Sequence, residues 1–177
     1  MPADVRRLFF ALWPDDGVRG QLAGLAARVA VGHGVRVAQA NLHITLVFLG
    51  SADGKLAACA QSAAAGIRGR AFTLSLDCLG HWPRPQVLWL GAKHTPAALA
   101  ALVQELNQGL TRCGFTPEDR PYQPHLTLAR KLRRADTAQA IDPVVWRVEQ
   151  FCLVQSITRA QGAEYRVLHT WPLNADA

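Results

Sequence analysis

The hydrophobic positions of the chain form short apolar runs and longer stretches with helical spacing. The first run, 8–13, is aromatic and aliphatic and stops at Pro14, as expected of a buried strand. Segments rich in alanine and leucine predict helices at 17–31, 55–67 and 96–113. Further strands are predicted at 42–49, 72–79, 86–90, 125–129, 144–149, 151–156 and 165–170.

Cap and turn residues support these boundaries. Asp15 or Asp16 can cap the first helix, Pro96 suits the first turn of the third, and Gly114 follows its end. Strands mixed with helices predict an α+β sandwich whose helices cover the outer faces of the sheets. The length of 177 residues fits one domain, or two small lobes that share a core.

One short pattern occurs twice in the chain. Asn41-Leu-His43-Ile-Thr45-Leu46 resembles Pro124-His125-Leu-Thr127-Leu128, and the two histidines are 82 residues apart. Two copies at this distance are too few and too far apart for a solenoid. The repeat instead indicates two similar lobes, each contributing one strand to a shared cleft.

Each copy places its histidine and threonine on one face of a strand, because side chains two residues apart point the same way. His43 and Thr45 form one such pair, and His125 and Thr127 form the other. The opposite faces are apolar stripes, made of Leu42, Ile44, Leu46 and Phe48 in the first strand and of Leu126 and Leu128 in the second. If the polar faces meet across a cleft, two imidazoles and two hydroxyls surround one site.

These groups suit the opening of a cyclic phosphate by in-line attack. One group must take a proton from water and another must protonate the leaving ribose oxygen, and a histidine serves either role near neutral pH. Threonine hydroxyls can donate hydrogen bonds to the phosphate oxygens. A single His-x-Thr is more often structural, but two copies in matching strands favour a paired site. The chemistry requires no metal or cofactor.

The chain resembles the 2H phosphoesterases, and specifically the bacterial RNA 2′,3′-cyclic phosphodiesterases once called 2′-5′ RNA ligases. The resemblance extends over nearly the whole chain and rests on Asn41-Leu-His-Ile-Thr-Leu-Val-Phe-Leu-Gly50, Pro124-His-Leu-Thr-Leu-Ala-Arg130, Arg7-Leu-Phe-Phe-Ala-Leu-Trp-Pro14, Leu153-Val-Gln-Ser156, Gly162, Tyr165 and Trp171-Pro-Leu173.

This resemblance implies one two-lobed domain over residues 1–177, with two mainly antiparallel sheets that form a central cleft. It implies hydrolysis of RNA 2′,3′-cyclic phosphate ends to 2′-phosphomonoesters, with reverse 2′-5′ ligation as a related reaction. By the same resemblance, His43 is the proton donor, His125 is the proton acceptor, and Thr45 and Thr127 hold the phosphate.

Three other side chains are candidates for contact with RNA. Phe9 and Phe48 can stack on a base, although core packing is the commoner role of such residues, and at most one of Phe9 and Phe10 can face the cleft. Arg130 can reach the phosphate or merely cap the strand edge, and strand parity turns it away from His125 unless the strand bends. Four other basic residues can contact the RNA backbone, although a solvated surface position is the default for such residues. They are Arg120, Lys131, Arg133 and Arg134. The tryptophans expected to be structural are Trp82, Trp89, Trp146 and Trp171.

Composition adds limits on partners and location. A net charge of +6 is compatible with a polyanionic partner but also with mere solubility. The chain has no P-loop, which argues against use of ATP, and it has no apolar run long enough to span a membrane. Its four cysteines are widely spaced, and we expect them to be reduced thiols in a cytoplasmic, monomeric protein.

Two other functions remain open on the sequence alone. One is a hydrolase of the same family that acts on a small cyclic nucleotide, which a preference for mononucleotides over oligonucleotides would identify. The other is an RNA-binding module without activity. The presence of both histidines and both threonines weighs against it.

Overall fold

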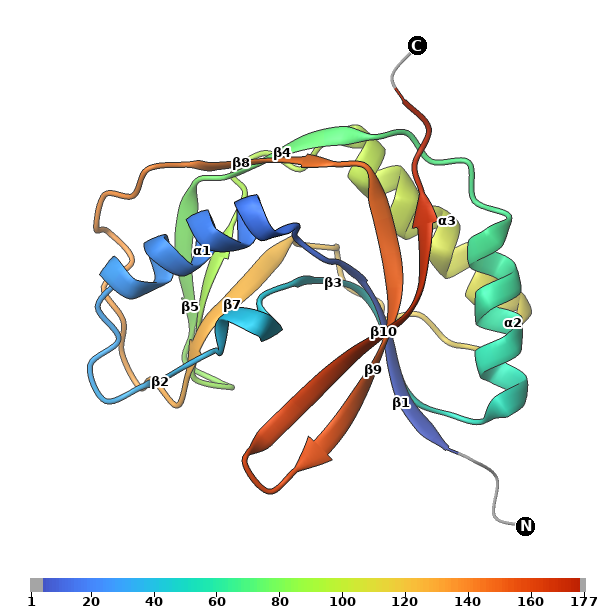
Figure 1. Ribbon diagram of the computed structural model, residues 1–177, viewed down its shortest axis with the longest axis horizontal. Coiled ribbons are helices and arrows are strands. Elements are labelled where there is room, and N and C mark those ends of the chain that lie inside the picture. Colours follow the sequence, from blue (N-terminus) through green and yellow to red (C-terminus); the bar gives the residue numbers. More distant parts are fainter. Residues whose placement is uncertain (1–4, 176–177) are drawn as a thin grey trace.

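The computed structural model describes residues 5–175 as a mixture of helices and antiparallel strands (Figure 1). The helices are α1 (Asp16–Arg28), α2 (Gly54–Ala65) and α3 (Ala97–Arg112), with a short 3₁₀ turn at Gln39–Asn41. The strands are β1 (Arg6–Leu12), β2 (Val35–Arg36), β3 (Ile44–Ala52), β4 (Phe72–Leu76), β5 (Cys78–Trp82), β6 (Val87–Gly91), β7 (His125–Arg130), β8 (Val144–Val148), β9 (Gln150–Arg159) and β10 (Gly162–Pro172).

Most strands belong to one sheet of eight, in the order β10-β9-β1-β3-β7-β6-β5, with β2 paired to β7. The other two, β4 and β8, form a separate antiparallel pair. The predicted α+β class and antiparallel sheets are therefore confirmed. The strands that carry the repeated motif, expected to face each other across a cleft, are instead neighbours within the larger sheet.

The core lies between the larger sheet and the helices. Leu8, Phe10 and Leu12 alternate along β1 and join a buried cluster with residues from all three helices and from β4 and β8. Phe9 and Ala11 point to the opposite face of β1, where they form a small cluster with Cys152 and Val154. The second face is thus left for the functional site.

The predicted helices are confirmed, with ends that differ by a few residues. The Asp15 carboxylate accepts from the backbone N–H of Val18 at 2.8 Å, which caps α1 as expected. Pro96 precedes the first turn of α3, and Gly114 beyond its end has a positive φ of 83°. None of the helices in the described part of the chain is long and apolar enough to cross a membrane.

The predicted strand at 72–79 is divided at Asp77, where the chain leaves the β4–β8 pair and enters the larger sheet as β5. The Asp77 carboxylate accepts from the backbone N–H of Lys93, and its own N–H donates to the Gly91 carbonyl. These two hydrogen bonds hold the chain at the crossing between the sheets.

The expectation of four reduced cysteines is wrong for one pair. Cys59 in α2 and Cys113 at the end of α3 form a disulfide, with their Cα atoms 5.8 Å apart. The two helices lie side by side (Figure 1). The cysteines are 54 residues apart in the sequence, so their spacing does not indicate that they meet. Among the described residues, Cys78 and Cys152 are free thiols.

Candidate active site

The two His-x-Thr motifs come together because β3 and β7 are antiparallel neighbours. Their one paired position is Ile44 with Leu126. This register places His43 next to Thr127 and Thr45 next to His125 on the same face of the sheet. All four side chains line one cavity of about 790 Å³.

Both motif strands contain a bulge directly after the threonine. Against β1, Thr45 pairs with Ala11 and Val47 with Phe10, so Leu46 is the extra residue. Against β6, Thr127 pairs with Trp89 and Ala129 with Leu88, so Leu128 is the extra residue. After each bulge, side chains alternate with the opposite parity.

The bulges bring Phe48 and Arg130 to the face of the histidines. The expectation that Phe48 belongs to the apolar stripe is wrong, because the consecutive residues Leu46 and Val47 are both buried and Phe48 is 41% exposed. Leu128 and Ala129 are likewise both buried, and the following Arg130 is exposed. Both Phe48 and Arg130 line the cavity.

Each imidazole has a backbone carbonyl two residues earlier as its partner. The Nδ1 atom of His43 lies 2.7 Å from the carbonyl oxygen of Asn41, and that of His125 lies 2.8 Å from the carbonyl oxygen of Gln123. A carbonyl oxygen can only accept, so Nδ1 carries the hydrogen in both rings. When either ring is neutral, its Nε2 is therefore the basic nitrogen.

Aromatic rings enclose His43. Trp13 stacks on its ring at 5.3 Å between centroids, and Phe9 and Tyr165 each lie 5.0 Å away. Burial lowers the pKa of His43 to about 4, and the nearby positive charges, chiefly Arg130, act in the same direction.

His125 has a more open environment. Trp82 approaches its ring edge-on at 4.6 Å, and Trp89 lies 6.3 Å away. Burial also lowers the pKa of His125, as do the charges of Arg120 and Arg130, against the effect of the hydrogen bond to Gln123. Both imidazoles are therefore predominantly neutral at pH 7 in the unliganded protein.

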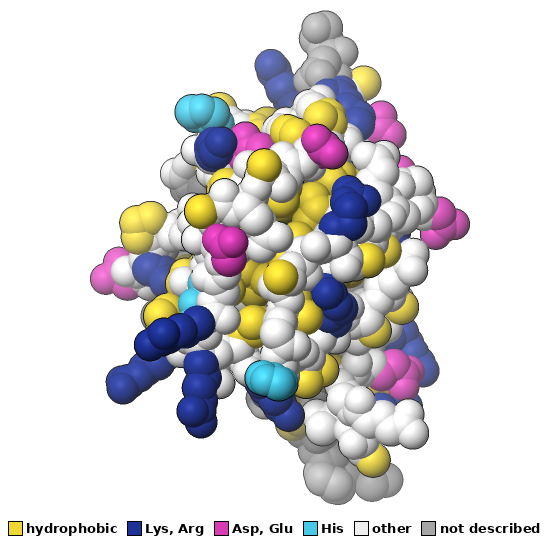
Figure 2. Space-filling view, turned by 90° about the vertical axis from the view of Figure 1, so that its left-hand side faces the viewer, with side chains coloured by type: hydrophobic (Ala, Val, Ile, Leu, Met, Phe, Trp, Pro, Cys, Tyr) yellow, Lys and Arg dark blue, Asp and Glu magenta, His cyan; other side chains and the backbone are white. Residues whose placement is uncertain are grey.

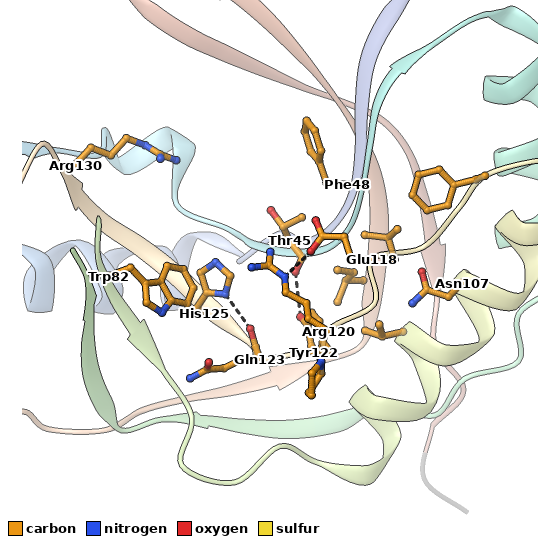
Figure 3. Close-up of a pocket in the computed structure, with 15 residues that line it drawn as sticks. Thr45, Phe48, Trp82, Asn107, Glu118, Arg120, Tyr122, Gln123, His125 and Arg130 are labelled. Carbon is orange, nitrogen blue, oxygen red and sulfur yellow. Dashed lines mark hydrogen bonds and ion pairs between the residues drawn. The ribbon is translucent and has the colours of Figure 1, made fainter. Parts of the chain in front are cut away.

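A second cavity of about 580 Å³ opens beside the first, toward α3 and the segment before β7 (Figure 3). The two cavities share Thr45, Phe48, Trp82, His125 and Arg130. The second is also lined by Asn107, by Tyr122 and by the ion pair between Glu118 and Arg120, in which Nε and Oε2 are 2.5 Å apart.

The other candidates from the sequence divide between the site and the surface. Phe9 lines the larger cavity and Phe10 is in the core, as parity required. Arg120 and Lys131 each line one cavity, whereas Arg133 and Arg134 line neither. Trp82, expected to be structural, instead lines both cavities.

Sequence reasoning missed two aromatic contacts of His43. Trp13 shares the strand parity of Phe9, and this signal was sufficient to place it on the same face. Tyr165 comes from β10, two strands away from β1, and no local pattern indicated that it contacts His43.

Known proteins are similar to this chain over most of its length. Residues 14–159 match the family model of the 2'-5' RNA ligase superfamily. An Escherichia coli protein named RNA 2',3'-cyclic phosphodiesterase is 34% identical over 97% of this chain and 98% of its own length. A protein of the same name from Aeropyrum pernix is 35% identical over 73% of this chain and 80% of its own.

Solved structures give the same result. The crystal structure of E. coli LigT in apo form has a TM-score of 0.85 and 34% identity, covering 96% of this chain and 98% of that chain. The structure of LigT complexed with 3'-AMP has a TM-score of 0.84 and 34% identity, covering 96% and 99%. The chain belongs to the 2'-5' RNA ligase superfamily.

Proposed function

We propose that this protein is an RNA 2′,3′-cyclic phosphodiesterase that hydrolyses cyclic phosphate ends to 2′-phosphomonoesters. The observation that carries the proposal is the convergence of two His-x-Thr motifs on one face of the sheet, with both imidazoles held in the same tautomer. The names of the E. coli and A. pernix relatives, and the 3'-AMP complex of E. coli LigT, support this choice of substrate.

In the proposed mechanism, His125 Nε2 takes a proton from a water molecule as the water oxygen bonds to phosphorus. The bond from phosphorus to the ribose 3′ oxygen breaks, and His43, protonated at Nε2, gives its proton to that oxygen. The hydroxyls of Thr45 and Thr127 donate to the remaining phosphate oxygens, and Arg130 offsets their charge. The direction of proton transfer follows the family resemblance, and reverse 2′-5′ ligation uses the same groups.

The protonation states fit an anionic substrate. Each imidazole has a lowered pKa in the empty site. A cyclic phosphate brings a negative charge next to both rings, which favours the imidazolium form needed for the acid. Substrate binding is therefore expected to raise the pKa values of the two histidines, which burial lowers in the empty site.

The proposal extends to the form and location of the protein. The motif strands are neighbours in one sheet, which supports a single domain, and we propose that it acts as a monomer. An RNA substrate supports a cytoplasmic location. The Cys59–Cys113 disulfide is at odds with that location, since cytosolic thiols are kept reduced.

The test is turnover of a short RNA with a 2′,3′-cyclic phosphate in EDTA, by wild type, His43→Ala and His125→Ala. We expect wild type to release a 2′-phosphate and each variant to be slower by at least about 100-fold, as for loss of a general acid or base. Arg68→Gln, a change at an exposed residue outside both cavities, is the control. An inactive wild type, or variants equal to it, would refute the proposal and favour an RNA-binding module.

A further inference from the structure

The two cavities offer two routes away from the histidines. A 2′,3′-cyclic phosphate is the 3′ end of an RNA, so the rest of the strand must leave the site toward its 5′ side. The shared residues, including His125 and Arg130, lie where the two cavities meet. The question is therefore which cavity suits a chain of phosphodiesters.

The larger cavity is lined by charges of one sign. Within the described residues, its charged lining side chains are all basic and are Arg7, Arg36, Arg130 and Lys131. We call this cavity the basic groove. The smaller cavity holds the paired Glu118 and Arg120, together with Asn107 and several aromatic residues. Phosphodiester chains are drawn to the first kind of surface, and a mixed polar and aromatic surface suits an uncharged base.

Basic side chains also gather on the outer surface. Figure 2 shows Lys and Arg side chains at the lower left of the face drawn there, with few acidic side chains nearby. Positive charge on the surface favours encounter with polyanions.

The basic side chains of the groove differ in the contacts that they already make within the protein. Both terminal nitrogens of Arg36 donate to carbonyls at the end of α1, those of Ala26 and Val29, so its guanidinium has a structural role. Arg7 lies over the Phe48 ring at 4.9 Å and lines the groove. Lys131 is exposed and follows Arg130 directly, at the end of β7. Arg7 and Lys131 are therefore the charges to test.

One wall of the groove is the β9–β10 hairpin, which projects from the sheet (Figure 1). It lines the groove with polar groups, Ser156, Thr158 and Gln161, that can bond to phosphate or ribose oxygens. The side-chain amide of Asn41 donates to the Ala163 carbonyl at 3.0 Å, which ties the hairpin to the segment before His43. The carboxylate of Glu164 accepts from Arg159 at 2.8 Å and does not line the groove.

We propose that the basic groove binds the ribose-phosphate backbone on the 5′ side of the cyclic end, so that the protein prefers oligonucleotides to mononucleotides. This inference rests on the proposed function and adds the path of the strand. Arg7 and Lys131 contact phosphates beyond the terminal nucleotide, and the hairpin wall bonds to the same stretch of backbone.

The test compares a mononucleoside 2′,3′-cyclic phosphate with a tetranucleotide that ends in the same group, over a range of salt concentrations. We expect wild type to favour the tetranucleotide in kcat/KM by about tenfold or more at low salt. Arg7→Gln and Lys131→Gln should each lower kcat/KM for the tetranucleotide several-fold and its dependence on log salt by about 0.7. Neither substitution should change kcat/KM for the mononucleotide by more than about twofold.

Matched variants separate charge from shape. Arg7→Lys and Lys131→Arg keep the charge and should keep the preference for length. Arg134→Gln removes a charge near Lys131 in the sequence but outside both cavities, and should leave the preference unchanged.

Three outcomes would overturn the inference. One is equal kcat/KM for both substrates at all salt concentrations. Another is a length preference that persists in the Arg7→Gln, Lys131→Gln double variant. The third is a preference lost in Arg120→Gln instead, which would place the strand in the smaller cavity. Hydrolysis of the mononucleotide that needs both histidines would still support the proposed function in each case.

Discussion

At the scale of single residues, the two imidazoles share a backbone setting but differ in enclosure. Each Nδ1–H donates to the carbonyl two residues earlier. Three aromatic rings surround His43, whereas the edge of Trp82 is the nearest ring to His125. Burial among these rings accounts for the lowered pKa of His43, because a buried imidazolium loses hydration.

We expect a bell-shaped pH profile of kcat/KM with both limbs below about pH 6.5, the ordinary pKa of histidine. Catalysis requires one proton on the pair, and burial lowers both pKa values, that of His43 to about 4. The limbs belong to the coupled pair rather than to either residue. The limbs of kcat should lie at higher pH, because bound phosphate favours the imidazolium forms. Measuring both profiles from pH 3 to 9 tests this.

Arg130→Gln should move the kcat/KM profile to higher pH. The guanidinium of Arg130 lowers the pKa of both histidines, so its removal lets both rise, while the rate falls because a contact to phosphate is lost. Arg68→Gln removes the same charge outside both cavities and should leave the profile in place. An alkaline limb of wild-type kcat/KM above pH 7, or an unmoved profile in Arg130→Gln, would contradict this account.

At the scale of elements, the positions of the motif residues followed from alternation, and the bulges did not. His43 with Thr45, and His125 with Thr127, share a face as strand geometry requires. A bulge adds one residue without changing the apolar composition of the strand, so Leu46-Val47 and Leu128-Ala129 look like ordinary core positions in the sequence. For that reason the sequence predicts the wrong face for Phe48. It predicts that Arg130 faces His125 only if the strand bends, and the bulge supplies that bend.

A tyrosine adds a second link between the two paired motif strands. They share one register position, Ile44 with Leu126, and the strands then separate around the smaller cavity. The Tyr122 hydroxyl donates to the Thr45 carbonyl at 3.0 Å, and so links the segment before His125 to β3 (Figure 3). Burial raises the pKa of Tyr122, which keeps the phenol protonated as a donor. We infer that this bond helps to set the spacing of the two histidines.

Tyr122→Phe should therefore lower kcat more than it changes KM. A neutral hydrogen bond contributes about 0.5–1.5 kcal/mol, so we expect kcat to fall by at most about tenfold and the free energy of unfolding by about 1 kcal/mol. The measurement is steady-state kinetics together with urea denaturation. Thr111→Val, which removes a hydroxyl bonded within α3, is the control for stability alone. Loss of stability in Tyr122→Phe with unchanged kcat would show that the bond is only structural.

At the scale of the whole molecule, local patterns predicted the helices, most strands and the class, but not how distant segments meet. The placement of both motif strands in one sheet depends on pairing between β3 and β7, which no local signal encodes. Tyr165 contacts His43, and Cys59 meets Cys113, for the same reason. Each contact joins segments far apart in the chain, where the energy comes from packing rather than propensity.

The disulfide gives the last prediction, since it closes a loop between residues 54 positions apart. In the chain-entropy model, such a loop stabilises the folded protein by about 4 kcal/mol through its effect on the unfolded state. We expect Cys59→Ala, Cys113→Ala and the double variant to lose about the same free energy of unfolding, because either change removes the same bond. Activity at 25 °C should persist, since neither cysteine lines a cavity.

Urea denaturation of the oxidised and reduced protein measures this difference, with Cys78→Ala as the control at a free thiol. Equal midpoints for the oxidised and reduced wild type would show that the bond adds no stability. Alkylation of free thiols in denaturant, added directly to intact cells, then decides the location, because Cys152 is buried in the folded protein. Two alkylated cysteines would mean that the disulfide forms in the cell, and would contradict the proposed cytoplasmic location. Four alkylated cysteines would support that location. In the second case α2 and α3 are held in place in the cell by their packing against each other and against the larger sheet, without this bond.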